Sequence, residues 1–312
     1  MRSAPCILAV LAGCYGPAAS TGVACGPGDA CPSGQECRAG VCVPIGLPHD
    51  AAPGEDAAGD ATMVTIDASP DAPLVLGPWG APTEITVTIG GETDPSITQD
   101  RLTIVLMSED DDDIYIGTRA NVNQDFTFAK LAAVSSTSTD KSPEISPNGG
   151  TLYFTSNRDG DYDVYRSTFT TQWSAPVLVP ELSTNDEDSD VAISPDGLTA
   201  AVLKNAATNI IRIHTRASTA VPFGAGVEHP EMTMGLTDPG APTITNGGAI
   251  VYMHVGSTRD IYMATRKMDG DYNLATAVTE VNTSSRDAAP FVLGDNRYML
   301  FERSSDIYET SR

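Results

Sequence analysis

The chain has 312 residues, of which 18 are Lys or Arg and 41 are Asp or Glu, so its formal net charge is -23. Nucleic acids and anionic membrane surfaces are bound through basic patches, so this balance argues against both as partners. Hydrophobic residues make up 41% and aromatic residues 6% of the chain, which is ordinary for a folded protein that carries a polar tail.

The N-terminus has the organisation of a secretory signal. Arg2 precedes an apolar run over residues 4–12, which is too short to span a bilayer as a helix. Residues 11–14, Leu-Ala-Gly-Cys, resemble the lipobox of bacterial lipoproteins. That resemblance implies a signal peptide over 1–13 and acylation of Cys14; a plain signal peptide is the alternative. Bacterial lipoproteins that are retained in the inner membrane typically have Asp directly after the acylated cysteine, and Tyr15 occupies that position here. The resemblance therefore implies that the protein is in the outer membrane, on its periplasmic or its outer side.

A cysteine-rich segment over residues 14–45 follows the signal. An even number of cysteines in a short exported segment predicts two disulfides, which replace an apolar core, and three pairings remain open. A zinc site is the alternative, but the spacing lacks Cys-x-x-Cys pairs. The segment resembles small Dickkopf-N-like segments of bacterial surface lipoproteins. The four cysteines are Cys25, Cys31, Cys37 and Cys42.

Residues 46–74 have the composition of a linker. They are rich in Ala, Pro and Asp, and neither Lys nor Arg occurs between Arg38 and Arg101. Such a chain buries too little apolar surface to offset its ordering entropy, so a disordered acidic spacer is expected.

Five repeats occupy residues 75–312. A Pro or Val anchor recurs at spacings of 48, 48, 51 and 48 residues, and turn residues such as Asn-Gly or Asp-Gly follow it in most units. Apolar residues stand nine and eleven positions after each anchor, which indicates a strand with one buried face. The anchors are Pro95, Pro143, Val191, Pro242 and Pro290.

Each unit also contains a third strand of the type Asp-Ile-Tyr, and four units contain a fourth strand near an aromatic residue or Leu. The last unit lacks the fourth strand, but Trp79-Gly-Ala-Pro82 matches Trp173-Ser-Ala-Pro176 of the second unit. We therefore predict an all-β chain: a five-bladed β-propeller of four-stranded antiparallel blades, closed by the N-terminal strand. Residues 146–166 resemble the WD-like repeat of the TolB propeller family, which implies the same fold.

Acidic residues precede the first strand of every unit. In a propeller these positions surround one mouth of the central channel, where five acids would attract a cation or a basic peptide segment. The structural alternative is that each carboxylate caps a turn of its own blade. The candidate residues for the axial mouth are Glu92, Asp140, Asp188, Asp238 and Asp287.

Other chemistry has weak support in the sequence. Asp159, Asp161 and Asp163 are spaced as calcium ligands can be, but a solvated hairpin tip is the commoner case and no metal is expected. The four histidines are scattered, and neither His-Glu-x-x-His nor Gly-x-Ser-x-Gly occurs, so no catalytic residue is predicted.

These features together favour a lipid-anchored cell-envelope protein whose propeller is a non-catalytic protein-binding platform. We expect a monomer that touches the membrane through its anchor only, uses no cofactor and binds an envelope or surface protein. The alternative is a glycan-binding or glycoside-cleaving propeller that uses acidic residues in the central funnel.

Overall fold

The computed structural model describes residues 35–38, 41–44, 76–205 and 208–312. The chain divides into two compact units, Met1–Ala72 and Pro73–Arg312. The predictions for the signal, for Cys14, Cys25 and Cys31, and for the linker fall outside the described residues. In the first unit, β1 (Gln35–Arg38) and β2 (Val41–Pro44) pair as an antiparallel hairpin whose register sets Cys37 opposite Cys42.

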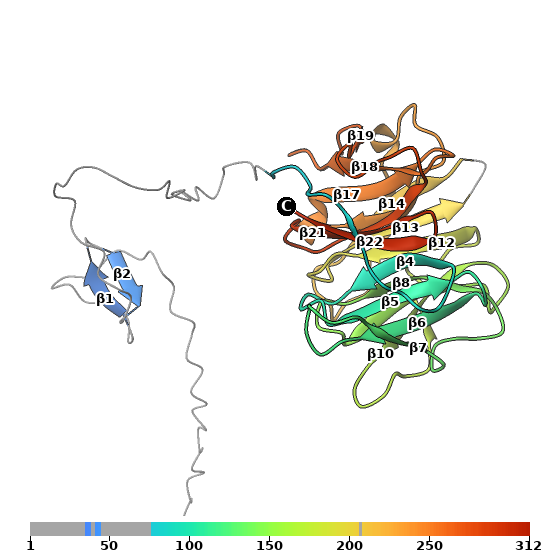
Figure 1. Cartoon of the computed structure of the whole chain (residues 1–312). Coiled ribbons are helices and arrows are strands. Elements are labelled where there is room, and N and C mark those ends of the chain that lie inside the picture. Colours follow the sequence, from blue (N-terminus) through green and yellow to red (C-terminus); the bar gives the residue numbers. More distant parts are fainter. Residues whose placement is uncertain (1–34, 39–40, 45–75, 206–207) are drawn as a thin grey trace, which may run out of the picture. The chain divides into compact units, whose positions relative to one another are not determined.

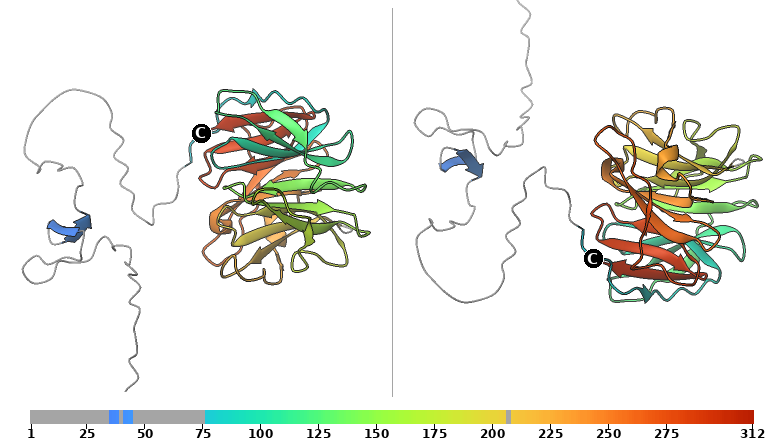
Figure 2. Two further views of the ribbon diagram at one scale, coloured as in Figure 1. Left: turned by 90° about the horizontal axis from the view of Figure 1, so that it is seen from below. Right: turned by 90° about the horizontal axis from the view of Figure 1, so that it is seen from above.

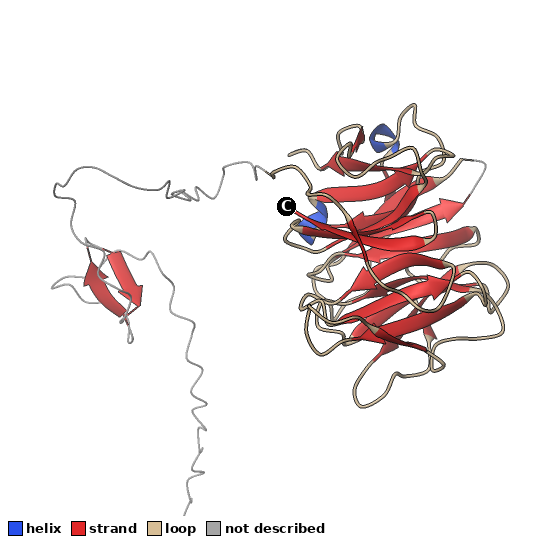
Figure 3. Ribbon diagram, viewed as in Figure 1, coloured by secondary structure: helices blue, strands red, loops and turns tan. Residues whose placement is uncertain are grey.

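The second unit is a five-bladed β-propeller, as predicted. Every blade is a four-stranded antiparallel sheet, and the described chain adds only two 3-10 turns, η1 (Pro230–Met232) and η2 (Asn246–Gly248) (Figure 3). No described helix has the length and apolarity needed to cross a membrane.

The strands follow one another outward from the axis in each blade. Blades 1 and 2 comprise β4 (Glu92–Ile97), β5 (Thr103–Ser108), β6 (Asp113–Thr118), β7 (Thr127–Lys130), and β8 (Asp140–Ile145), β9 (Thr151–Ser156), β10 (Asp163–Thr168), β11 (Val177–Leu178). Blades 3 and 4 comprise β12 (Glu187–Ile193), β13 (Thr199–Asn205), β14 (Ile210–Thr215), β15 (Val227–Glu228), and β16 (Gly240–Ile244), β17 (Ile250–Val255), β18 (Asp260–Thr265), β19 (Thr276–Ala277). Blade 5 comprises β20 (Asp287–Val292), β21 (Tyr298–Arg303), β22 (Asp306–Ser311) and β3 (Thr83–Glu84).

The core lies between neighbouring blades, around the second strands. Side chains nine and eleven positions after each anchor are 0% exposed in all five units, so the repeat pattern marks the buried face correctly. Residues of adjacent blades share clusters; for example, Leu203 of β13 packs in one cluster with Val251 and Met253 of β17. The ten buried residues are Ile104, Leu106, Leu152, Phe154, Ala200, Val202, Val251, Met253, Met299 and Phe301.

The N-terminal strand closes the ring. β3 pairs with β22, with Glu84 opposite Tyr308 and Thr83 opposite Glu309. The backbone N–H of Ile85 donates to the carbonyl of Ile307 at 2.8 Å, which extends the pairing. Figures 1 and 2 show this teal segment beside the red final strands. The predicted closure is confirmed, and it gives the last blade its fourth strand.

Each innermost strand contains an irregularity in its register with the second strand. At this point four blades have a non-glycine residue with positive φ, a conformation that L residues seldom adopt outside functional or over-determined sites. The bulge turns the backbone at the channel, so it decides which side chains face the axis. The four residues are Asp94 (φ 50°), Ser142 (φ 49°), Ala241 (φ 42°) and Ala289 (φ 45°).

Candidate functional site

The central channel is narrow where the innermost strands of the five blades meet. The innermost strands of all five blades line an axial cavity of about 30 Å³, and the anchor residues of the repeat are among its lining. A cavity of this size accommodates little more than a water molecule. A ligand that uses the axis must therefore bind at a mouth of the channel.

One mouth widens into a funnel of about 510 Å³ where the innermost strands begin. Its described lining comes from all five blades and includes carboxylates, cations and amides, but no Phe, Tyr or Trp. The charged residues of this lining are Asp94, Glu109, Lys141, Asp190, Asp238, Arg259 and Arg286.

Asp94 and Asp190 face each other through one hydroxyl group. Oγ of Ser142 lies 2.6 Å from Oδ1 of Asp190 and 3.3 Å from Oδ2 of Asp94. The Asp190 carboxylate also accepts a hydrogen bond from the backbone N–H of Ala241 at 3.2 Å. A hydroxyl has one hydrogen and cannot donate to both carboxylates at once, so a proton on Asp94 satisfies both contacts.

Electrostatics supports a proton on Asp94. Burial raises the pKa of Asp94 to about 7, and the neighbouring carboxylate of Asp190 acts in the same direction. Lys141 and the Ser142 hydroxyl oppose this rise without cancelling it. Asp94 therefore keeps its proton in acidic solution and loses it near pH 7.

Two further polar groups of the funnel lack a partner among the described residues. They are Nδ1 of His254, whose side chain is 8% exposed, and Oγ of Ser189, which is 1% exposed. Burial lowers the pKa of His254 to about 4, and Arg259 acts in the same direction, so the imidazole is neutral at neutral pH. Gly240 admits this ring, because a Cβ there would collide with Nε2 of His254.

Three of the acids predicted for the axial mouth serve their own blades. Asp140 is 0% exposed and accepts hydrogen bonds from the N–H and hydroxyl of Ser136, at 2.6 and 2.9 Å, and from Arg158 at 2.5 Å. Asp188 binds Thr184 and Arg212 in the same way, and Asp287 binds Thr283 and Arg303. These carboxylates are fully occupied as caps and ion pairs.

The other two predicted acids differ. Glu92 is buried and accepts a hydrogen bond from the backbone N–H of Gly90 at 3.0 Å. Asp238 is exposed, lines the funnel and accepts a hydrogen bond from Nδ2 of Asn209 at 2.9 Å. Of the five predicted residues, only Asp238 lines the funnel cavity. The acids that face the axis, Asp94 and Asp190, lie two positions further along their strands.

The residues considered for calcium do not converge. Asp159 accepts a hydrogen bond from the Tyr165 hydroxyl at 2.6 Å, and burial raises the pKa of Asp163. Within the described residues, one other set of three possible metal ligands does gather its donor atoms within 4.8 Å: His229, Glu231 and Asp271.

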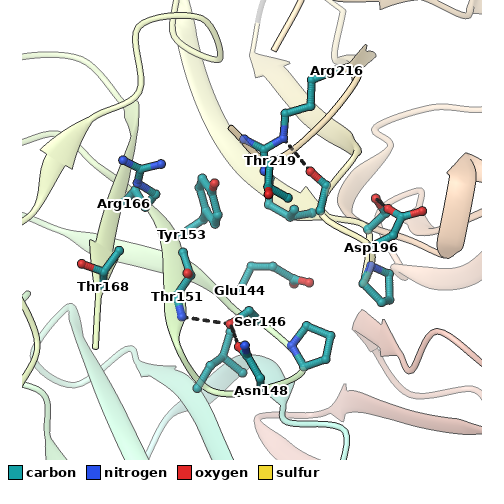
Figure 4. A pocket seen from close by; sticks show the side chains of 16 residues that line it. Glu144, Ser146, Asn148, Thr151, Tyr153, Arg166, Thr168, Asp196, Arg216 and Thr219 are labelled. Carbon is teal, nitrogen blue, oxygen red and sulfur yellow. Dashed lines mark hydrogen bonds between the residues drawn. The ribbon is translucent and has the colours of Figure 1, made fainter. Parts of the chain in front are cut away.

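A second cavity of about 420 Å³ lies between blades 2 and 3, near the ends of their innermost strands (Figure 4). Glu144 lines both this cavity and the axial one. Burial raises the pKa of Glu144 well above its usual range, although a hydrogen bond from the backbone N–H of Ile193 opposes the rise. This carboxyl group can therefore donate a proton to a polar ligand.

Known proteins resemble the chain in fold. No family model matches it, and no curated protein matches it. A putative TolB from Agrobacterium tumefaciens has 17% identity and a TM-score of 0.47 over 68% of this chain and 69% of that one. TolB from Acinetobacter baumannii has 15% identity and a TM-score of 0.44, over 71% and 54%.

Enzymes occur among the similar structures as well. The PQQ-bound aldose sugar dehydrogenase from Streptomyces coelicolor has 10% identity and a TM-score of 0.47, over 77% of this chain and 99% of that one. Likeness at this level concerns the propeller fold and leaves the activity open. A five-bladed β-propeller with an acidic pair in its funnel is the class of protein that the fold and site define.

Proposed function

We propose that the protein is anchored in the outer membrane through acylated Cys14 and that its propeller is a non-catalytic binding platform for another envelope protein. The lipobox-like residues 11–14 support the anchor. The acidic linker over 46–74 would hold the propeller away from the lipid surface on the periplasmic or outer side.

The acidic pair in the funnel carries the binding role. Neither Asp94 nor Asp190 takes part in a salt bridge within the described residues, although both lie in a partly buried site. A Lys or Arg side chain from a partner would add an ion pair that Lys141 of the funnel does not form with Asp94, and would displace the proton of Asp94. Electrostatic complementarity at this mouth would select a basic segment of the partner.

A capture experiment tests the platform. The full-length protein is used to capture partners from detergent-solubilised envelopes, beside a double variant with Asp94→Asn and Asp190→Asn. We expect a specific partner with the unmodified chain and its loss with the double variant. The matched control is Asp125→Asn, an exposed carboxylate of blade 1. A partner that binds all three proteins equally would show that the acidic pair of the funnel is not its binding site.

The anchor has a separate test. Radiolabelled palmitate should be incorporated into the unmodified chain and not into a Cys14→Ser variant, which should also leave the membrane fraction. Equal labelling of both proteins would contradict acylation at Cys14.

A glycoside-cleaving propeller is the second candidate, and the same pair favours it. Two carboxylates that contact one hydroxyl are about as close as the acid and the nucleophile of retaining glycosidases, which are about 5–5.5 Å apart. A carboxyl group whose pKa is raised to about 7, placed beside a second carboxyl group, is also the kind of arrangement that such chemistry uses. Against it, the described lining of the funnel has no Phe, Tyr or Trp side chain on which a sugar ring could stack.

Oligosaccharide turnover separates the two functions. The enzyme predicts new reducing ends that disappear in Asp94→Asn and in Asp190→Asn, while Asp125→Asn serves as an exposed control outside the funnel lining. Neither turnover nor binding with a broad set of oligosaccharides would dismiss this candidate.

A further inference from the structure

Three side chains of metal-ligating type meet at the boundary between blades 3 and 4. His229 follows the outer strand β15, Glu231 lies in η1, and Asp271 lies in the hairpin between β18 and β19. One donor atom of each residue lies within 4.8 Å of the donor atoms of the other two. The ligands therefore come from two chain segments that are 40 residues apart and that only the fold brings together.

Buried neighbours hold two of these ligands in place. Nδ1 of His229 lies 3.0 Å from Oε1 of Glu231, and the same oxygen accepts a hydrogen bond from the backbone N–H of Tyr272 at 3.1 Å. The His229 ring is 9% exposed and packs edge-on against the Tyr272 ring, with 5.0 Å between centroids. Tyr272 is fixed in turn, because its hydroxyl donates to the carbonyl of Gly248 at 2.7 Å. Such preorganisation is what a metal site requires of its surroundings.

The chemistry of the set favours a transition metal over calcium or magnesium. Calcium and magnesium take oxygen ligands, whereas one imidazole with two carboxylates suits Zn²⁺ and the neighbouring divalent metals.

A route from solvent to the site also exists. His229 lines a cavity of about 550 Å³ formed by blade 3 and by the segment that leads from it to β16, and Asp271 is exposed at its hairpin. Three protein ligands leave a fourth tetrahedral position for water or for a small ligand. The cavity gives space next to the imidazole for such a group.

We propose that His229, Glu231 and Asp271 form a binding site for one Zn²⁺ ion, with a fourth position open to solvent. Bound metal would join the segment that leaves blade 3 to the outer hairpin of blade 4. None of the three ligands lines the funnel, although Asn209 and Asp238 line both the funnel and the cavity beside His229.

The test is metal binding to the oxidised full-length protein. Zn²⁺ is titrated by calorimetry into the metal-free protein and into the His229→Ala, Glu231→Gln and Asp271→Asn variants. We expect the unmodified chain to bind one more equivalent of Zn²⁺ than each variant does. The affinity of the site for Zn²⁺ should fall by at least about 100-fold in each variant, which is more than the loss of a residue that only supports a ligand would cause. Zn²⁺ should raise the melting temperature of the unmodified chain, and a chelator should reverse the rise.

Asp271→Asn keeps the test decisive if His229→Ala fails to fold, because Asp271 is exposed. Its melting temperature without metal should equal that of the unmodified chain. Co²⁺ in place of Zn²⁺ reports the ligand type, and nitrogen and oxygen ligands lack the sulfur-to-cobalt absorption that cysteines would give. Zn²⁺ binding that is equal in the unmodified chain and in Asp271→Asn, or sulfur absorption that the variants retain, would overturn the proposal.

Discussion

Asp94 combines partial burial, a strained backbone and a charged neighbour at one position of the channel. Its φ is 50°, and burial together with Asp190 raises its pKa to about 7. Such a residue lowers the stability of the folded state when it is ionised. Its backbone conformation persists because the surrounding fold enforces it. This cost is the signature of a group held for binding or chemistry rather than for stability.

Replacement of Asp94 by Asn should change how stability depends on pH. The folded carboxyl keeps its proton up to about pH 7, whereas the unfolded one loses it near the ordinary value of 3.8. Between these values the folded state binds more protons, so the stability of the unmodified chain falls as pH rises. Relative to it, Asp94→Asn should gain roughly 4 kcal/mol across this interval and nothing further above it. Urea unfolding from pH 3 to 9 measures the difference, and a difference that does not vary with pH would contradict the raised pKa.

Asp140 represents the opposite case, a carboxylate that serves the fold. Its oxygens are satisfied by Ser136 and Arg158 within blade 2. Asp140→Asn leaves the partly buried Arg158 without its counter-charge, so the free energy of unfolding should fall by about 3 kcal/mol. The exposed Asp238→Asn is the matched control, with a change within about 0.5 kcal/mol. Unchanged stability of Asp140→Asn together with lost partner binding would assign this carboxylate to function instead.

At the scale of a strand, Gly117 of β6 allows the outer strand of blade 1 to pack closely. A Cβ at this position would lie 2.6 Å from Cε1 of Phe128 and 2.8 Å from Cγ2 of Ile104. The Phe128 ring of β7 thus covers the place where other residues have a side chain. The absence of a side chain, and not a special φ, explains the glycine.

Gly117→Ala should therefore destabilise the propeller. The added methyl group must displace Phe128 or Ile104, which typically costs about 1–3 kcal/mol in a packed core. Gly77→Ala is the control, because a Cβ there would meet nothing within 4 Å. Thermal unfolding of both variants measures the difference. Equal melting temperatures would show that blade 1 accommodates the added methyl group without loss of stability.

The innermost strands explain why the sequence predicted the fold better than the site. Buried pairs such as Ile104 and Leu106 are two residues apart in every unit, a spacing that marks a strand face directly. The bulges leave no such mark, so the acids chosen from the sequence lie two positions before Asp94 and Asp190. The approach of Asp271 to His229 is a contact between distant segments, which spacing along the chain cannot reveal.

At the scale of the whole molecule, the first strand of the propeller determines whether the ring is closed. Trp79 is 5% exposed and packs edge-on against Tyr252 of blade 4, with 6.4 Å between ring centroids. The Arg312 guanidinium lies 4.0 Å from the centre of its ring. The indole therefore joins the first segment, blade 4 and the C-terminus, whereas Trp173 packs in the core cluster of blades 1 and 2 and contacts Phe169 of its own blade.

Trp79→Ala should consequently lower the free energy of unfolding by more than the matched change Trp173→Ala. Loss of a buried Trp costs about 3–5 kcal/mol, and here it also loosens β3 and frees the edge of β22. An uncovered edge pairs with other chains, so oligomers should accompany the loss of stability. Trp173 is only partly buried and no blade edge depends on it, so its variant should remain monomeric with a smaller loss. Urea unfolding and size-exclusion chromatography measure both effects, and equal behaviour of the two variants would mean that closure does not depend on Trp79.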